Sequence, residues 1–255
     1  MLLHSNILGD GEPFLILHGF LGTGDNWKTL GKKFSALGYQ VHLIDQRNHG
    51  RSFHNDVFDY ETLSNDLNYY ISHYQLKNCI LLGHSMGGKT VMQFATQFPE
   101  SVKKLIVADI SPRYYPTHHD TILEGLSALN FAEIKSRSSA DSILSNYVHE
   151  MGTRQFLLKN LYWVEKGQLG LRINLDVLKR NVSEVGEALP NFAKYDGDTL
   201  FLRGDKSEYI TSSDEDIITM HFPEAILQTI KNAGHWLHAE NPKDFFEAVV
   251  QFINA

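Results

Sequence analysis

The stretch Gly83-His84-Ser85-Met86-Gly87 constrains the fold of this chain more than any other feature of its sequence. It directly follows the apolar run Cys79-Ile80-Leu81-Leu82 and precedes a helical pattern over residues 88–98. A serine in a tight turn between a strand and a helix is strained, and flanking glycines let the two elements pack closely. Its hydroxyl is then held at the positive end of the helix, where negative charge is stabilised. The stretch therefore predicts a nucleophilic serine on a strand–turn–helix unit.

A second pattern fits the same residues. Gly83 to Thr90 reads G-H-S-M-G-G-K-T, which matches the phosphate-binding loop G-x-x-x-x-G-K-[ST]. The run Leu105-Ile106-Val107-Ala108-Asp109 resembles the strand that ends in a magnesium-binding aspartate in such proteins. Nucleotide binding is therefore an alternative function, which the other features of the sequence have to support or exclude.

Composition narrows the class of protein. The chain has 255 residues, of which 42% are hydrophobic and 21% charged, as expected for a globular α/β domain. Its net charge of −7 argues against non-specific nucleic-acid binding. No apolar run approaches the roughly 18–20 residues that cross a bilayer, and residues 1–6 lack the basic start of a signal peptide. We expect a soluble, cytoplasmic protein that is not inserted in a membrane.

Short apolar runs alternate with helical patterns along most of the chain. Residues 2–8 and 14–17 are expected to form an opening hairpin, and the further strands are expected at 41–45, 78–83, 104–109, 199–203 and 225–230. Helical spacing separates them, at 27–37, 60–74, 88–98 and 243–253. This alternation predicts a mainly parallel sheet with helices on both faces.

The alternation stops at Ser111-Pro112. From there to about Pro190 the pattern is helical, at 121–129, 139–150, 153–160 and 176–185, without a convincing run of buried strands. Ligands bind at the carboxyl edge of parallel sheets, and a helical insertion between two strands is expected to cover that edge. The sequence therefore predicts an α/β core from residues 1–111 and 191–255 with a helical lid from residues 112–190.

A serine nucleophile needs a base and an oxyanion hole. Gly234-His235-Trp236 lies between the last expected strand and the last expected helix, where the α/β-hydrolase fold carries its histidine. The turn His18-Gly19-Phe20-Leu21-Gly22 ends the second expected strand. We expect His235 to be the base, and the backbone N–H groups of Phe20 and Met86 to hold the oxyanion.

The acid that orients the histidine has two candidates. In this fold it usually follows the strand at residues 199–203, about three residues past a glycine, but that position holds Ser207, which carries no charge. Asp205 lies beside it, and Asp109 ends the preceding strand, from which a carboxylate also reaches the histidine. We favour Asp109, with Asp205 as the alternative.

The remaining polar and aromatic features have other interpretations. We expect residues 45–52 to form a hydrogen-bonded structural turn and His84 to pack beside the turn rather than face Ser85. His118 and His119 point in different directions if adjacent on a helix or strand, so no metal and no cofactor are predicted. Candidate substrate-binding residues are His18, Tyr114, Phe156, Trp163 and Trp236.

With these pieces placed, the chain resembles the small α/β-hydrolases of the YbfF type, which are bacterial esterases related to a mitochondrial α/β-hydrolase-domain protein. The resemblance rests on HGFLG at 18–22, DQRNHGRS at 45–52, GHSMGGKTVM at 83–92, KLIVADISP at 104–112, QFLLKNL at 155–161 and AGHWLHAENP at 233–242. It implies hydrolysis of short acyl esters, and in some members of acyl thioesters, with Asp109 as the acid. Asp205 departs from the family, which more often has glycine there.

These observations favour a serine carboxylesterase that acts on short-to-medium acyl esters through an acyl-enzyme on Ser85. The nucleotide-binding interpretation assigns no role to His18, His235 or the lid, whereas the hydrolase interpretation assigns a role to each of them. Two further alternatives stay open: a thioesterase or lactonase with the same residues, and a ligand-binding signalling protein of low turnover. The sequence does not determine the physiological substrate, the acyl chain length or the oligomeric state.

Overall fold

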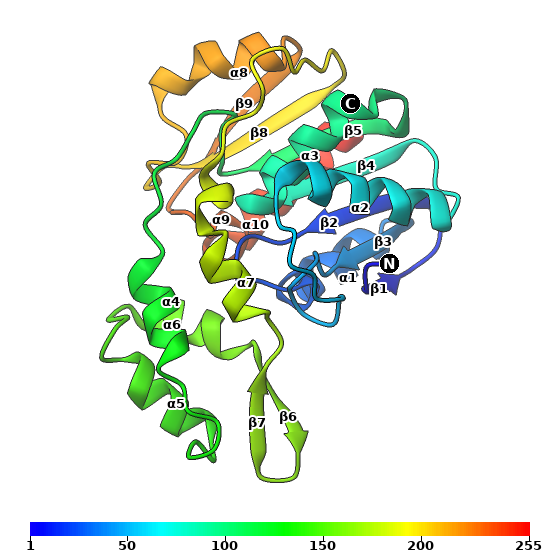
Figure 1. The fold of residues 1–255 in the computed structure, drawn as a ribbon. Coiled ribbons are helices and arrows are strands. Elements are labelled where there is room, and N and C mark those ends of the chain that lie inside the picture. Colours follow the sequence, from blue (N-terminus) through cyan, green and yellow to red (C-terminus); the bar gives the residue numbers. More distant parts are fainter.

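A computed structural model describes residues 1–255, and its centre is a seven-stranded sheet (Figure 1). The strand order is β1-β3-β2-β4-β5-β8-β9. The strands are β1 (Ser5–Leu8), β2 (Glu12–Leu17), β3 (Tyr39–Ile44), β4 (Cys79–His84), β5 (Val102–Ala108), β8 (Thr199–Gly204) and β9 (Ala225–Ile230). Only β1 runs antiparallel to its neighbour, so the predicted mainly parallel sheet is present.

The predicted opening hairpin is wrong. β1 pairs with β3 rather than with β2, because β3 lies between them in the sheet. The turn at Gly9–Gly11 carries the chain past the start of β3, and both glycines have positive φ angles, of 73° and 122°. A Cβ atom on Gly11 would lie 2.1 Å from the carbonyl oxygen of Gly38, so the turn packs directly against the chain that enters β3.

Helices cover both faces of the sheet (Figure 1). Helices α2 and α3 pack on one face against Leu15 and Leu81, whereas α1 and α10 pack on the other against Phe14 and Ile80. Alternate residues of one strand point to opposite faces, which is why each buried strand contributes to both apolar cores. The helices of this part are α1 (Lys28–Ser35), α2 (Tyr60–His73), α3 (Met86–Gln97), α8 (Glu215–His221), α9 (Leu237–Glu240) and α10 (Pro242–Ile253), with 3₁₀ turns at Gly24–Trp27, Pro99–Ser101 and Ser212–Asp214.

The chain between β5 and β8 forms a separate layer beyond one edge of the sheet, which we call the inserted segment (Figure 1). It contains α4 (Asp120–Ser127), α5 (Arg137–Leu144), α6 (Met151–Leu158), the hairpin strands β6 (Leu161–Glu165) and β7 (Gln168–Leu171), α7 (Leu175–Arg180) and a 3₁₀ turn (Val182–Gly186). Its own apolar core includes Phe20, Leu21 and Met86 from the sheet side. The inserted segment therefore packs directly on the loops at the carboxyl ends of the strands.

The β6–β7 hairpin is a second difference from the sequence prediction, which expected helices alone in this region. Only Leu161 of β6 and Leu169 of β7 are buried, and the rest of both strands is partly or fully exposed. A hairpin without a buried face lacks the run of buried apolar residues by which a strand is recognised.

Lys89 joins the two ends of the inserted segment. Its side chain is fully buried in α3, and its ammonium donates to the carbonyl oxygens of Pro112 (3.3 Å), Arg113 (2.5 Å) and Glu187 (2.6 Å). Pro112 and Arg113 lie where the segment leaves the sheet, and Glu187 where it returns. A single buried cation thus satisfies carbonyl groups of both connections.

None of the helices combines the length and the apolar character that a bilayer-spanning helix needs.

Candidate active site

Ser85 lies in the sharp turn between β4 and α3 with φ 53° and ψ −120°, a strained conformation for a residue with a side chain. The flanking glycines are required by close backbone contacts. A Cβ atom on Gly83 would lie 2.1 Å from the Gly87 carbonyl oxygen, and one on Gly87 would lie 2.4 Å from the Leu17 carbonyl oxygen. The turn therefore forms only with glycine at both positions, and it places Ser85 at the wall of a cavity.

His235 and Asp109 come together from loops that are far apart in the sequence. His235 follows β9, Asp109 directly follows β5, and His235 Nδ1 donates to Asp109 Oδ2 over 2.8 Å. Asp109 is fully buried and has a positive φ of 54°. This hydrogen bond places the proton of a neutral imidazole on Nδ1 and leaves Nε2 as an acceptor on the same cavity as Ser85. No hydrogen bond joins Ser85 Oγ to His235, a contact that often tightens only when substrate binds.

Two further donors bind the Asp109 carboxylate. The Gly204 amide donates to Oδ1 over 3.1 Å, and the Ser207 hydroxyl donates to Oδ2, the same oxygen that His235 contacts. Both donors come from the end of β8 and the loop after it. The fully buried carboxylate is thus held by hydrogen bonds on both oxygens.

Asp205 lies apart from His235. Its side chain accepts from the Ala233 amide over 3.0 Å and is exposed. Hydrogen bonds from the Asn232 and Ala233 amides hold the pKa of this carboxyl below its usual range. Asp205 therefore fastens the loop that carries His235, and the structure does not bring its carboxylate to the imidazole.

The turn at residues 18–22 places its backbone against Ser85. A Cβ atom on Gly19 would lie 3.2 Å from Cβ of Ser85, so glycine allows this approach. The Phe20 amide donates to no acceptor within the protein. Met86 is the first residue of α3, and its N–H is one of the groups that a helix start leaves free. Two amides expected to hold an oxyanion thus lie on either side of Ser85.

The turn at residues 45–52 supports the loop that carries Phe20. The Asp45 carboxylate accepts from the Gly24 amide (2.7 Å) and the Arg51 amide (2.9 Å), and His49 Nε2 accepts from the Leu21 amide (3.2 Å). Arg47 forms an ion pair with Asp66 beneath it. These contacts agree with the interpretation of this stretch as a structural turn.

Buried neutral histidines surround the cavity. Burial lowers the pKa of His18 to about 4 and that of His238 to about 3, and it holds the pKa of His84 well below its usual range. His18 donates from Nδ1 to the Gly19 carbonyl (2.8 Å) and accepts at Nε2 from the Gln46 amide (3.0 Å), so both ring nitrogens are engaged within the protein. His84 donates to the His235 carbonyl oxygen over 2.7 Å. His18 and His84 thus hold the turns on either side of Ser85.

Tyr209 stacks on His235. The ring centroids are 3.8 Å apart and the planes differ by 16°. The Tyr209 hydroxyl hydrogen-bonds to Nε2 of His118 over 2.7 Å, and His118 belongs to the inserted segment. One face of the His235 imidazole is therefore covered by an aromatic ring whose hydroxyl is bonded to the inserted segment.

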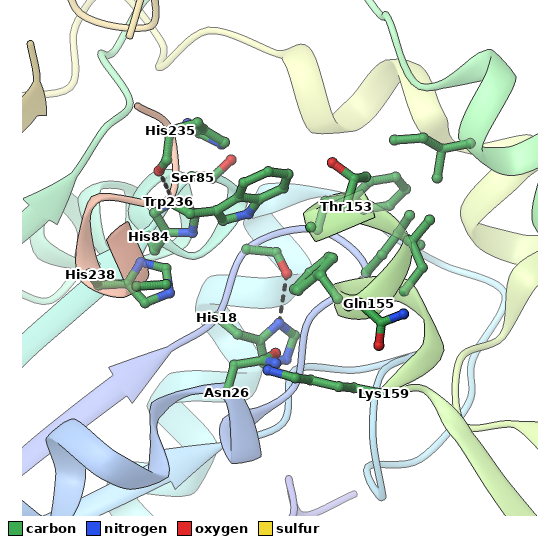
Figure 2. Close-up of a pocket in the computed structure, with 18 of the residues that line it drawn as sticks. His18, Asn26, His84, Ser85, Thr153, Gln155, Lys159, His235, Trp236 and His238 are labelled. Carbon is green, nitrogen blue, oxygen red and sulfur yellow. Dashed lines mark hydrogen bonds between the residues drawn. The ribbon is translucent and has the colours of Figure 1, made fainter. Parts of the chain in front are cut away.

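The cavity beside Ser85 has a volume of about 540 Å³, within the usual range for small-molecule sites. Of the predicted substrate-binding residues, His18, Phe156 and Trp236 line it. Figure 2 shows Ser85, His235 and Trp236 at one end and Thr153, Gln155 and Lys159 of the inserted segment at the other. The wall is mainly apolar, with a few polar groups directed inward.

Tyr114 and Trp163 do not reach this cavity, contrary to the sequence prediction. Tyr114 is 50% exposed beside the connection from β5, and Trp163 is 52% exposed on the β6–β7 hairpin. Aromatic spacing alone could not tell which face of the inserted segment points to Ser85.

Sequence reasoning missed several residues that line the site. Tyr209, His119, Asn26 and Lys159 line the cavity, although the sequence predicted no substrate contact for any of them. Ser207, which carries no charge and so was no candidate for the acid, binds the Asp109 carboxylate. Position in the loop after β8 was the one available signal for Ser207 and Tyr209, because loops at the carboxyl ends of parallel strands carry ligand contacts.

The phosphate-loop alternative conflicts with the position of Lys89. In that alternative the lysine side chain must reach phosphates beside the glycine-rich turn. Here its ammonium is buried and donates to three carbonyl oxygens at the base of the inserted segment. Lys89 therefore has a structural role.

Comparison with known proteins places these features in a family. Residues 12–131 match the family model described as alpha/beta hydrolase fold. The chain is 39% identical to the mouse (Mus musculus) sn-1-specific diacylglycerol lipase ABHD11, over 98% of this chain and 85% of the mouse protein. It is 30% identical to esterase YbfF of Escherichia coli (strain K12), over 96% of this chain and 94% of that protein. A solved structure titled marine microorganism esterase superimposes with a TM-score of 0.95 at 40% identity, covering 99% of both chains.

Proposed function

The chain belongs to the α/β-hydrolase family and is a carboxylic ester hydrolase, and we propose that it acts as a serine esterase that forms an acyl-enzyme on Ser85. Membership confirms the predicted fold class and the resemblance to YbfF-type esterases. The observation that carries the proposal is the hydrogen bond of 2.8 Å from His235 Nδ1 to Asp109 Oδ2 on the cavity that exposes Ser85.

In the proposed reaction, His235 Nε2 accepts the proton of the Ser85 hydroxyl as its oxygen attacks the ester carbonyl carbon. The carbonyl oxygen becomes an oxyanion, which the Phe20 and Met86 amides stabilise. The imidazolium then donates its proton to the departing alcohol, and the acyl group stays on Ser85. Water, deprotonated by His235, attacks the acyl-enzyme, and the imidazolium then returns this proton to Ser85 Oγ as the bond between Ser85 and the acyl group breaks and the acid leaves.

Asp109 acts on His235 rather than on substrate. Its carboxylate holds the proton on Nδ1, which keeps Nε2 available as base, and it stabilises the imidazolium that forms in each step. Because the side chain is buried, its charge acts with little screening by solvent. Its position supports Asp109 over Asp205 as the acid.

We propose that residues 112–190 form a lid that sets the substrate class. Phe156 of this segment packs against Trp236 of the core in the wall of the cavity, with ring centroids 5.9 Å apart. A mainly apolar cavity of about 540 Å³ suits esters with short-to-medium acyl chains. The mouse relative is named for its action on diacylglycerol, and glycerol esters of short acids are substrates to include.

The test is hydrolysis of p-nitrophenyl esters from acetate to laurate by the wild type and by Ser85→Ala. We expect saturable activity with an optimum at intermediate chain length, and its loss in Ser85→Ala. Trapping of an acylated Ser85 by mass spectrometry after rapid acid quench identifies the intermediate. Activity that survives in Ser85→Ala would contradict the mechanism.

The same assay separates the alternatives. Thioesters and lactones are tested with the same pair of proteins. Faster hydrolysis of one of them than of any ester would identify a thioesterase or a lactonase that uses the same three residues. Ligands that bind saturably to the wild type without turnover on any substrate would favour a binding protein instead.

A further inference from the structure

A second cavity, which we call the basic cavity, adjoins the active-site cavity. It has a volume of about 230 Å³, and none of the residues that line it is hydrophobic. They are Thr23, Asp25, Asp45, Gly50, Arg51, Arg137, Lys159 and Arg172. Lys159 lines both cavities, so its side chain lies at their junction. In Figure 2 the Lys159 side chain extends past Gln155 to Asn26, at the end of the site away from His235.

The cations of the basic cavity are poorly neutralised by the protein. Lys159 takes part in none of the salt bridges of the protein. Arg137 donates only to the carbonyl oxygens of Leu158 (2.6 Å) and Leu161 (2.7 Å). The Arg172 guanidinium lies over the Tyr162 ring at 4.4 Å. None of these three side chains is paired with a carboxylate.

The two carboxylates of the cavity contact Arg51 and groups of the core, and neither contacts Arg137, Lys159 or Arg172. Asp45 accepts from the Gly24 and Arg51 amides, and Asp25 accepts from Asn6 over 3.0 Å and lies 4.0 Å from the exposed Arg51 guanidinium. Four cations and two carboxylates leave this cavity with a formal charge of +2 in a chain whose net charge is −7. A local positive field beside the substrate cavity attracts anions to it.

We propose that the basic cavity binds a phosphate group carried at the far end of the ester substrate, an inference that rests on the proposed esterase function. Guanidinium groups bind phosphate oxygens through paired N–H donors, and a lysine adds a point charge. A phosphate dianion matches the surplus charge of the cavity. Lys159 lines both cavities, which places the phosphate site next to the cavity that holds the ester.

The basic cavity depends on the docking of the inserted segment. Arg51 comes from the core turn, whereas Arg137, Lys159 and Arg172 come from the inserted segment. A substrate phosphate bridging these groups links the two parts of the protein across the site. The phosphate site is therefore complete only when the inserted segment is docked on the core.

The experiment compares matched esters that differ only in a terminal phosphate. One series carries the phosphate on the alcohol, as butyryl esters of ω-hydroxyalkyl phosphates with two to eight carbons, and the other carries a phosphonate at the end of the acyl chain. Each has a neutral partner of equal length, and acid release is followed by titration. We expect the phosphorylated ester of the fitting length to have a kcat/KM at least about ten-fold higher, the usual gain from a charge-assisted contact.

Charge removal tests the residues. Arg172→Gln and Arg51→Gln each remove one cation of the cavity, and Lys166→Gln removes an exposed cation from the tip of the β6–β7 hairpin as the control. The quantity compared is the ratio of kcat/KM for the phosphorylated and the neutral ester. We expect this ratio to fall several-fold in the first two variants, to stay unchanged in Lys166→Gln, and to fall with rising salt in the wild type.

A binding measurement separates this proposal from the esterase proposal. Inorganic phosphate at constant ionic strength should raise the Tm of Ser85→Ala, and Arg172→Gln in the same background should remove the effect. Phosphate binding in a protein without any esterase activity would support the phosphate site and contradict the proposed esterase mechanism on Ser85. Equal rates for phosphorylated and neutral esters in both series would overturn the substrate proposal. Phosphate binding that Arg172→Gln leaves unchanged would overturn the site.

Discussion

The Ser207 hydroxyl donates to the same oxygen of Asp109 that accepts the hydrogen bond from His235. Ser207 lies on the loop after β8, where an acid was expected from the general pattern of the fold, and Asp109 lies at the end of the neighbouring strand β5. The two side chains thus meet from adjacent strands. A serine in the usual position of the acid supports an acid that comes from the strand beside it.

Ser207→Ala removes this contact and should lower kcat about ten-fold with little change in KM. The carboxylate keeps its bonds to Gly204 and His235 but loses a donor that fixes its orientation, and small misplacements of catalytic groups are costly. Ser207→Thr keeps the hydroxyl and should recover most of the activity. Steady-state kinetics on one p-nitrophenyl ester checks both variants, and equal losses in the two would reject the role of the hydroxyl.

Asp109→Asn should lower kcat by up to about 10⁴-fold, as expected when the orienting acid of a serine–histidine pair is lost. Asp205→Asn should reduce activity only slightly, because its side chain bonds to the Ala233 amide rather than to His235. Both proteins are compared at the pH optimum of the wild type after their fold is checked by circular dichroism. Near-full activity in Asp109→Asn, together with loss in Asp205→Asn, would reverse the assignment.

Tyr209→Leu should lower kcat several-fold, because it removes the ring that stacks on His235 at 3.8 Å. Tyr209→Phe keeps the ring and loses only the hydrogen bond to His118, so it should be much closer to the wild type. The pH profile of kcat/KM provides the second readout. Loss of the aromatic face beside the imidazole makes its protonated, charged form less stable. Identical profiles in the wild type and Tyr209→Leu would indicate that the ring only fills space.

Lys89→Met should loosen both connections of the inserted segment, because the carbonyl groups of Pro112, Arg113 and Glu187 lose their common donor. The expected loss in unfolding free energy is at least about 2 kcal/mol, the penalty for buried acceptors left without a partner. Denaturant unfolding measures it, and limited proteolysis should cut first within residues 112–190. Lys32→Met, on the exposed face of α1, is the control and should change neither result.

The buried histidines predict loss of stability in acid. Burial lowers the pKa of His18 to about 4 and those of His49 and His238 to about 3, from an ordinary value of 6.5. Between pH 6.5 and about 4 the unfolded chain binds protons that the folded chain does not, so the unfolding free energy falls as the pH falls. Each such group contributes at most about 1.4 kcal/mol per pH unit, reached well between its unfolded and its folded pKa.

Denaturant unfolding at pH 7.5, 6.0 and 5.0 measures this dependence. His238→Phe should flatten it, because it removes one titrating group while keeping an aromatic ring against Trp27, whose centroid lies 4.1 Å from that of His238. A replacement of the exposed His73 by Gln serves as the control and should leave the slope unchanged. A wild-type stability that stays constant from pH 7.5 to 5.0 would contradict the prediction.

Much of the architecture was predictable because it follows from local patterns. The apolar runs that form β3, β4, β5 and β8 are short and largely buried, as strands covered on both faces are. The glycines on either side of Ser85 predict a tight turn, because a side chain at either position would clash with the backbone. The pairing of β1 was not predictable in this way, because a turn with glycines says that the chain bends but not which strand lies beside it.

Local patterns of residues specify most elements and the candidate chemistry: an alternating α/β order, the turn that carries Ser85, and the order in which Ser85, Asp109 and His235 occur. Which side chains meet depends on how the chain packs in three dimensions. This packing brought Ser207 to Asp109, stacked Tyr209 on His235, and turned Trp163 away from the cavity. The physical reason is that periodicity and turn residues are properties of neighbouring positions, whereas contacts between distant positions depend on how the inserted segment and the sheet pack together.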